Sequence, residues 1–169
     1  MGVAEEPAAD SLSRSKLTPP QIPVDALSQP QVLSVLASQP NARVLLFCAP
    51  AGFGKTTALS LLVQQRQAQG HLVAWFSLAS EDDDPSRFYT QLIEALRGAL
   101  PPFGEDALNY LRNTMQVPVA AVMESLLVDL SAVTQPLLLV LDDLHELHNP
   151  ELIKALNRLV RLAPANFTL

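Results

Sequence analysis

The chain has 169 residues, 49% hydrophobic and 17% charged, with 17 acidic and 11 basic side chains and a formal charge of −6. Since domains commonly contain about 100–200 residues, this length corresponds to one domain at most, or to part of one. The apolar content argues against global disorder and repeat architectures, and the acidic balance argues against binding nucleic acid or an anionic membrane through bulk charge. One cysteine cannot form an intramolecular disulfide or a thiolate zinc site, which favours a reducing compartment.

The N-terminal residues do not have the pattern of a targeting signal. Residues 1–16 contain no apolar core, and they carry acidic residues where a signal peptide would be basic. The longest central apolar stretch, 117–130, includes two acidic residues and is shorter than the roughly 20 residues of a membrane span. We therefore expect a cytoplasmic protein with no membrane partner.

Composition predicts three parts along the chain. Residues 1–15 are small, polar and acidic, which predicts a disordered tail. Residues 16–42 contain several prolines around a short apolar pattern, which predicts an extended lead-in followed by one short helix beginning near Pro30. Residues 43–169 form the predicted folded domain.

Within this domain, apolar runs of strand length alternate with segments of helical spacing. The predicted strands are short and wholly apolar, as in strands buried on both faces, and comprise 44–48, 72–78, 137–141 and an opening fourth strand at 167–169. The predicted helices have amphipathic spacing, capping residues or both, and comprise 55–69, a helix starting at Pro85, 106–114, 118–131 and 150–162. Strands that alternate with helices predict an α/β fold with a mainly parallel sheet.

Residues 49–57, Ala-Pro-Ala-Gly-Phe-Gly-Lys-Thr-Thr, directly follow the first predicted strand and open the first predicted helix. This context is that of a phosphate-binding loop, or Walker A motif, in a relaxed form because Ala49 replaces the usual first glycine. Gly52 and Gly54 allow backbone amides to turn toward phosphates, and the helix N-terminus adds unpaired amides and a positive dipole end. The alternative is a glycine turn without a ligand, which the flanking strand and helix make less favourable.

The side chains of this loop predict a nucleoside triphosphate as ligand. Lys55 would bridge the β- and γ-phosphates, and the Thr56 hydroxyl would ligate Mg²⁺. The candidate nucleotide-binding residues are those of the loop and the first helical turn: Ala51, Gly52, Phe53, Gly54, Lys55, Thr56 and Thr57.

A second candidate element follows the strand at 137–141, where apolar residues run into Asp142 and Asp143. Asp142 is placed to hold Mg²⁺ directly or through water, as in a Walker B motif, and Asp143 could orient or activate the attacking water. Asp143 and Lys55 are thus the candidate catalytic residues. Capping of the following turn is the alternative role, and for Asp143 it is as well supported as the catalytic one. His145 could sense the γ-phosphate or could be an ordinary surface histidine.

Other polar and aromatic residues have simpler interpretations. The acidic run 81–84 fits a solvated loop and helix cap better than a metal site. Cys48 and Trp75 lie in predicted buried strands, which indicates core packing. The last predicted helix carries a basic stripe that we expect on its solvated side, made of Lys154, Arg158 and Arg161.

Several motifs together resemble those of one family. Besides the phosphate loop they are Ala-Trp-Phe-Ser-Leu at 74–78, Asp-Pro-Ser-Arg-Phe at 84–88 and Leu-Val-Leu-Asp-Asp-Leu-His at 139–145, and Ser-Lys-Leu-Thr-Pro-Pro at 15–20 is similar to the family's usual start. Over about residues 15–169 the chain resembles the N-terminal ATPase domain of the large LuxR-type, MalT-like transcriptional regulators. These regulators belong to the STAND class of signalling P-loop ATPases.

The resemblance implies a three-layer P-loop NTPase fold, AAA-like, with a mainly parallel sheet. It implies that ATP and Mg²⁺ are bound, with Asp142 at the metal and Asp143 near the hydrolytic water. In this family ATP binding and hydrolysis switch a resting monomer to a self-associating form, and DNA binds only through a C-terminal domain. We therefore expect an ATP-binding, slowly hydrolysing switch domain with ATP and ADP as its ligands.

The chain departs from the family pattern in two ways. Residues 28–31 carry no basic residue where family members usually have one, which leaves base recognition open. Beyond the position of Leu169 the family continues into a strand ending in Ser-Arg, which lies between the phosphate-loop strand and the Asp142 strand. We therefore expect a fold that is incomplete at its C-terminal end, as in a fragment of a larger regulator.

Two alternative functions are consistent with a phosphate loop. A small-molecule kinase would need an acceptor pocket and an arginine-rich lid, for which Arg87, Arg97 and Arg112 are widely scattered. A non-catalytic nucleotide-binding remnant would act as an interaction module through exposed sheet edges.

Overall fold

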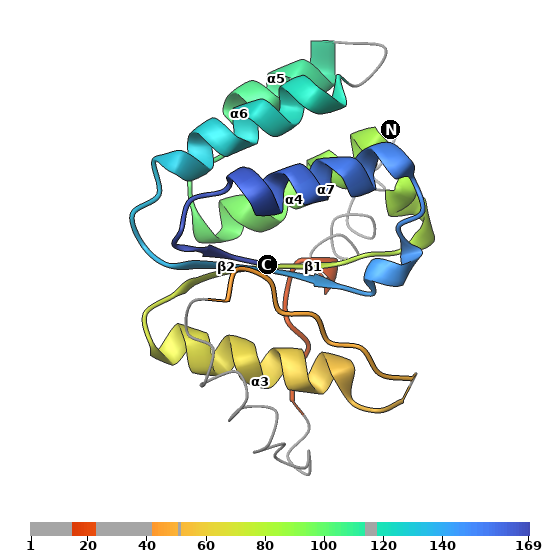
Figure 1. The fold of residues 1–169 in the computed structure, drawn as a ribbon, viewed down its shortest axis with the longest axis vertical. Coiled ribbons are helices and arrows are strands. Elements are labelled where there is room, and N and C mark those ends of the chain that lie inside the picture. The colour runs from red at the N-terminus through yellow and green to blue at the C-terminus, as the bar shows by residue number, and fades with distance from the viewer. Residues whose placement is uncertain (1–14, 23–41, 51, 114–117) are drawn as a thin grey trace, which may run out of the picture.

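The computed structural model describes residues 15–22, 42–50, 52–113 and 118–169 (Figure 1). The predicted short helix near Pro30 lies outside these ranges, as do residues 1–14 of the predicted tail and Ala51 of the phosphate loop. Among the helices of the described chain, none has the length and apolarity needed to cross a bilayer.

Three parallel strands form a sheet in the order β1-β2-β3. They are β1 (Leu72–Ser77), β2 (Leu137–Asp142) and β3 (Phe167–Thr168). The register of β1 and β2 runs from Leu72 opposite Leu137 to Ser77 opposite Asp142. The parallel sheet, connected by helices, confirms the predicted α/β class.

Helices cover both faces of this sheet and create three layers (Figure 1). On one face lies α3 (Lys55–Ala68), and on the other lie α4 (Pro85–Ala99) and α7 (Pro150–Leu162). The helices α5 (Glu105–Asn113) and α6 (Val119–Ser131) pack beyond α4 and α7, away from the sheet.

Alternate side chains of the strands enter two separate cores, because successive residues of a strand point to opposite faces. Trp75, Leu138 and Val140 pack with α3. Phe76 and Leu139 enter the larger core formed with the helices on the other face. Trp75 is therefore a packing residue, as predicted, and it also donates a hydrogen bond to the hydroxyl of Ser77 (2.8 Å).

The helix boundaries follow the predicted capping residues closely. Gly70, at a φ of 82°, follows the end of α3, where only glycine fits easily. The side chain of Asp84 accepts a hydrogen bond from the Arg87 amide (3.0 Å) and caps α4, which begins at Pro85. The helix predicted at 150–162 has the same bounds in the structure.

Residues 44–48 do not form a regular β-strand, so the prediction of a strand there is wrong. The amide of Leu169 donates to the Arg43 carbonyl (2.9 Å) and the Leu45 amide donates to the Leu169 carbonyl (2.8 Å), which places this segment beside β3. From residue 46 onward, its backbone makes no hydrogen bond to another strand within the described ranges. The apolar pattern is that of a strand, but a strand needs a neighbouring chain to pair with.

The same lack of a neighbour corrects the prediction for Cys48. This residue was expected in the core, and it is exposed. Side chains on the 44–48 segment alternate between the α3 side and an uncovered side, and Cys48 shares the uncovered side with Leu46.

Candidate functional site

The predicted phosphate loop joins the 44–48 segment to the first turn of α3. Gly52 and Gly54 have φ values of 80° and 75°, in the left-handed region that other residues rarely adopt. A Cβ at Gly52 would meet no atom within 4 Å. Glycine is therefore favoured at this position by the backbone angle and not by a lack of space. Between the two glycines, Phe53 is exposed, away from both cores.

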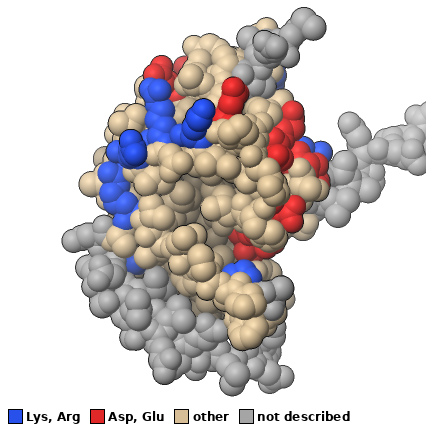
Figure 2. Space-filling view, turned by 45° about the vertical axis from the view of Figure 1, so that its right-hand side comes forward, with Lys and Arg blue, Asp and Glu red and all other residues tan. Residues whose placement is uncertain are grey.

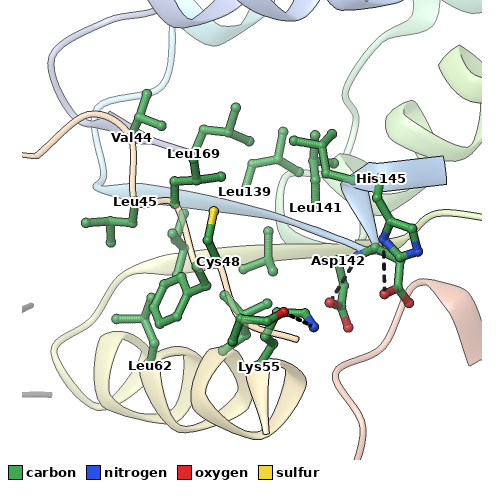
Figure 3. Close-up of a pocket in the computed structure, with 18 residues that line it drawn as sticks. Val44, Leu45, Cys48, Lys55, Leu62, Leu139, Leu141, Asp142, His145 and Leu169 are labelled. Carbon is green, nitrogen blue, oxygen red and sulfur yellow. Dashed lines mark hydrogen bonds and ion pairs between the residues drawn. The ribbon is translucent and has the colours of Figure 1, made fainter. Parts of the chain in front are cut away.

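The Lys55 ammonium folds back over the loop from which α3 starts. It donates hydrogen bonds to the Ala49 carbonyl (2.8 Å) and the Pro50 carbonyl (3.1 Å), and Figure 3 shows it at the polar end of a cavity. Charged phosphate oxygens are stronger acceptors for an ammonium than neutral carbonyls are. An anion in the loop would therefore compete well for this lysine.

Thr56 and Asp142 meet directly, although they are distant in sequence. The Thr56 hydroxyl donates to one carboxylate oxygen of Asp142 (2.9 Å), and the other oxygen accepts from the Asp143 amide (3.0 Å). Asp142 is buried at the C-terminal end of β2. A hydroxyl and a carboxylate in contact provide the hard oxygen ligands that Mg²⁺ prefers, with further ligands coming from phosphates and water.

Asp143 is the only non-glycine residue in the described ranges with a positive φ, which is 55° and lies in the left-handed region. Its carboxylate is partly exposed and lies 3.8 Å from Nδ1 of His145. The His145 side chain is 71% exposed and is also 3.4 Å from Glu146. His145 therefore has the exposure of a surface histidine while it lies beside the candidate base.

A cavity of about 640 Å³ brings the two predicted motifs together (Figure 3). One wall is the segment 44–48, the opposite wall is β2, and both walls are mainly apolar. Lys55, Asp142 and Asp143 lie among its lining residues, so the phosphate loop and the end of β2 share one hollow.

Sequence reasoning missed the contribution of the acidic run at 81–84. Asp82 was expected in a solvated loop, and it is 0% exposed. Its carboxylate accepts hydrogen bonds from Lys16 (2.8 Å), Arg87 (3.2 Å) and the Ala79 amide (2.8 Å), so the buried charge is fully paired. Arg87 lies five residues away and could have been proposed as a partner, but Lys16 lies 66 residues away and its contact depends on the tertiary fold.

The expected basic stripe of α7 is on the surface. Lys154, Arg158 and Arg161 are exposed, as predicted, and Arg158 forms an ion pair with Glu124 of α6. Figure 2 shows most of the Lys and Arg side chains on the left of the viewed face and most of the Asp and Glu side chains on the right.

The comparisons with known proteins assign the family. Residues 39–169 match the family described as AAA domain, a stretch that includes the phosphate loop, β2 and the cavity. The chain belongs to the AAA domain family. Membership of the AAA domain family implies nucleotide binding in general.

Among the relatives of this AAA domain are bacterial proteins named as transcriptional regulators. The chain is 34% identical over 155 residues to the HTH-type transcriptional regulator MalT of Serratia proteamaculans. It is 30% identical over the same length to the proteins of that name from Cronobacter sakazakii and Klebsiella pneumoniae. Each alignment covers 92% of this chain and 17% of the relative, so the AAA domain corresponds to a small part of those proteins.

Proposed function

We propose that this chain is an ATP-binding, slowly hydrolysing switch domain of a transcriptional regulator similar to MalT. The observation that carries this proposal is the hydrogen bond between Thr56 and Asp142, because it joins the predicted Walker A and Walker B elements. Lys55 lies at the polar end of the cavity beside this bond, where a phosphate could meet both elements.

Different residues of the site would bind the phosphates, the metal ion and the attacking water. The amides of residues 51–57 and the N-terminus of α3 would surround the phosphates, and Lys55 would leave the carbonyls of the loop to bind the β- and γ-phosphates. Thr56 and Asp142 would hold Mg²⁺, which would neutralise charge on the phosphates. Asp143 would orient the attacking water, and its exposed side chain, 3.8 Å from Nδ1 of His145, is consistent with slow hydrolysis.

The regulatory part of the proposal extends beyond the described domain. ATP and ADP states would control self-association of the parent protein, and DNA would be bound by a separate C-terminal domain, in the cytoplasm. Residues 43–169 would be the P-loop domain and 16–42 its lead-in, anchored by the ion pair of Lys16 with Asp82.

The kinase alternative would need an arginine-rich lid. Arg87, considered for that lid, forms an ion pair with the same Asp82 carboxylate, which favours a switch over a kinase.

Calorimetric titration with ATP and ADP, with and without Mg²⁺, tests the proposal. Lys55→Ala should weaken ATP binding by about 10- to 100-fold, because hydrogen bonds to charged groups contribute about 1.5–3 kcal/mol. Thr56→Val should lose the enhancement by Mg²⁺, whereas the control Thr56→Ser should keep it, because serine retains the hydroxyl.

Each outcome of this titration separates the candidate functions. If neither wild type nor Lys55→Ala binds a nucleotide, the switch proposal is wrong, and a non-enzymatic remnant that binds partners through exposed sheet edges is favoured. If wild type binds ATP, release of phosphate in the absence of an acceptor distinguishes an ATPase from a small-molecule kinase.

A further inference from the structure

The loop that leaves β2 carries Asp143 and His145, and it is held at both ends. At its start, the Asp142 carbonyl accepts a hydrogen bond from the Leu78 amide (3.0 Å). At its end, one carboxylate oxygen of Asp83 accepts hydrogen bonds from the amides of His148 and Asn149, each at 2.7 Å. The loop is therefore fixed by residues that follow the neighbouring strand, β1.

The contact between Asp83 and Asn149 is reciprocal. The Asn149 side-chain amide donates to the Asp83 carbonyl (3.3 Å), while its side-chain oxygen caps α7 by accepting from the Glu151 amide (3.0 Å). Hydrogen bonds to an ionised carboxylate are stronger than those between neutral groups. In agreement with these contacts, the pKa of Asp83 is lowered, most by the hydrogen bond from the Asn149 amide and next by the one from the His148 amide.

The backbone of the loop needs such an anchor. Asp143 has a left-handed conformation, which is strained for a non-glycine residue and persists where surrounding contacts enforce it. The Glu146 amide donates to the Asp143 carbonyl (2.9 Å), so this conformation is linked to the short 3₁₀ turn η2 (Leu144–Glu146) that follows. The hydrogen bonds that Asp83 accepts hold His148 and Asn149, which begin one residue beyond that turn.

Asp83 is itself immobilised by its neighbours in the chain. On one side, Asp82 is buried between Lys16 and Arg87. On the other side, Asp84 caps α4 through the Arg87 amide. Because both neighbours are fixed, Asp83 presents its carboxylate from a rigid support rather than from a free loop.

We propose that Asp83 is a positioning residue that holds Asp143 and His145 at the cavity, and so allows the domain to distinguish ATP from ADP. This inference rests on the proposed function. The phosphate loop holds Lys55 and Thr56 independently of Asp83, so it would bind the phosphates that ATP and ADP share. Asp143 and His145 line the cavity together with Lys55. The imidazole N–H of His145 would donate to the third phosphate, and Asp143 would hold the attacking water beside it.

The test compares the affinities of one variant for two nucleotides. Asp83→Ala should weaken binding of a non-hydrolysable ATP analogue by about tenfold and binding of ADP by less than about twofold, because only the third phosphate depends on the anchored loop. Asp83→Asn should retain most of the discrimination, because its amide oxygen still accepts from both backbone amides. The ratio is taken within one variant, so a general loss of folded protein cancels.

Asp129→Ala is the matched control. The Asp129 carboxylate also accepts a hydrogen bond from a backbone amide, that of Gly104 (2.8 Å), but it lies on α6 and not at the loop after β2. It should leave the ratio of ATP-analogue to ADP affinity unchanged. Equal weakening of both nucleotides by Asp83→Ala, or a loss in Asp83→Asn as large as in Asp83→Ala, would overturn the inference.

Amide hydrogen exchange tests, without any nucleotide, whether Asp83 anchors the loop after β2. The amides of residues 146–149 should exchange faster in Asp83→Ala than in wild type, and those of α3 should be unchanged. If wild type binds neither nucleotide, the proposed function fails while this measurement still tests the anchor. Unchanged exchange at 146–149 in Asp83→Ala would show that Asp83 does not hold the loop.

Discussion

Gly104 shows how a single backbone angle restricts the choice of residue. It has a φ of 71°, and a Cβ at this position would lie 2.7 Å from Cγ2 of Ile93. Gly104→Ala should therefore lower the free energy of unfolding by about 1–3 kcal/mol through backbone strain and overpacking. Urea unfolding followed by circular dichroism measures the change.

Gly98 is the matched control for this substitution. It is exposed near the end of α4, and a Cβ there would meet no atom within 4 Å. Gly98→Ala should raise the free energy of unfolding by about 0.5 kcal/mol, because alanine loses less backbone entropy in a helix. A loss of stability in Gly98→Ala equal to that in Gly104→Ala would contradict the steric explanation.

Asp83 also gives a prediction for the pH dependence of stability. Its folded-state pKa is below the unfolded value, so its stabilising contribution is complete above the unfolded pKa and is lost as the pH falls through the folded pKa. The advantage of wild type over Asp83→Asn in urea midpoint should therefore be larger at about pH 6 than at about pH 3. A difference that stays constant between these two conditions would show that the charge of Asp83 does not contribute.

At the scale of an element, α4 and α7 begin in the same way. Each has proline in its first turn, preceded by a capping side chain, Asp84 or Asn149. Asp84→Ala should lower the free energy of unfolding by about 1 kcal/mol, because the Arg87 amide loses its acceptor. Asp84→Ser should recover most of this loss in the same urea experiment, and equal losses in both variants would rule out capping as the cause.

At the scale of the whole molecule, α6 tests how firmly the outer helices belong to the core. Leu126 is 1% exposed and packs in the larger core, whereas Val128 on the same helix is 67% exposed. Leu126→Ala should lower the free energy of unfolding by about 2–5 kcal/mol, and Val128→Ala by less than about 0.5 kcal/mol. Urea unfolding compares them, and similar losses in both would mean that α6 does not share the core described here.

Most of the fold was predictable because its signals are local. Apolar runs of strand length predicted β1 and β2, and Asp84 with Pro85 predicted the start of α4. The apolar spacing of residues 150–162 predicted α7. The left-handed Gly52 and Gly54 could be expected from the phosphate-loop spacing alone. Local backbone preferences decide these features, so the sequence by itself determined them.

The tertiary structure decided which residues lie together and which lie exposed. Thr56 meets Asp142, Lys16 meets Asp82, and Asp83 holds Asn149, each across a long sequence separation. The burial of Asp82 and the exposure of Cys48 cannot be predicted from the residues next to them in the sequence. Both depend on whether another part of the chain supplies a partner, because a buried charge needs counter-charges and an apolar strand needs a neighbouring backbone.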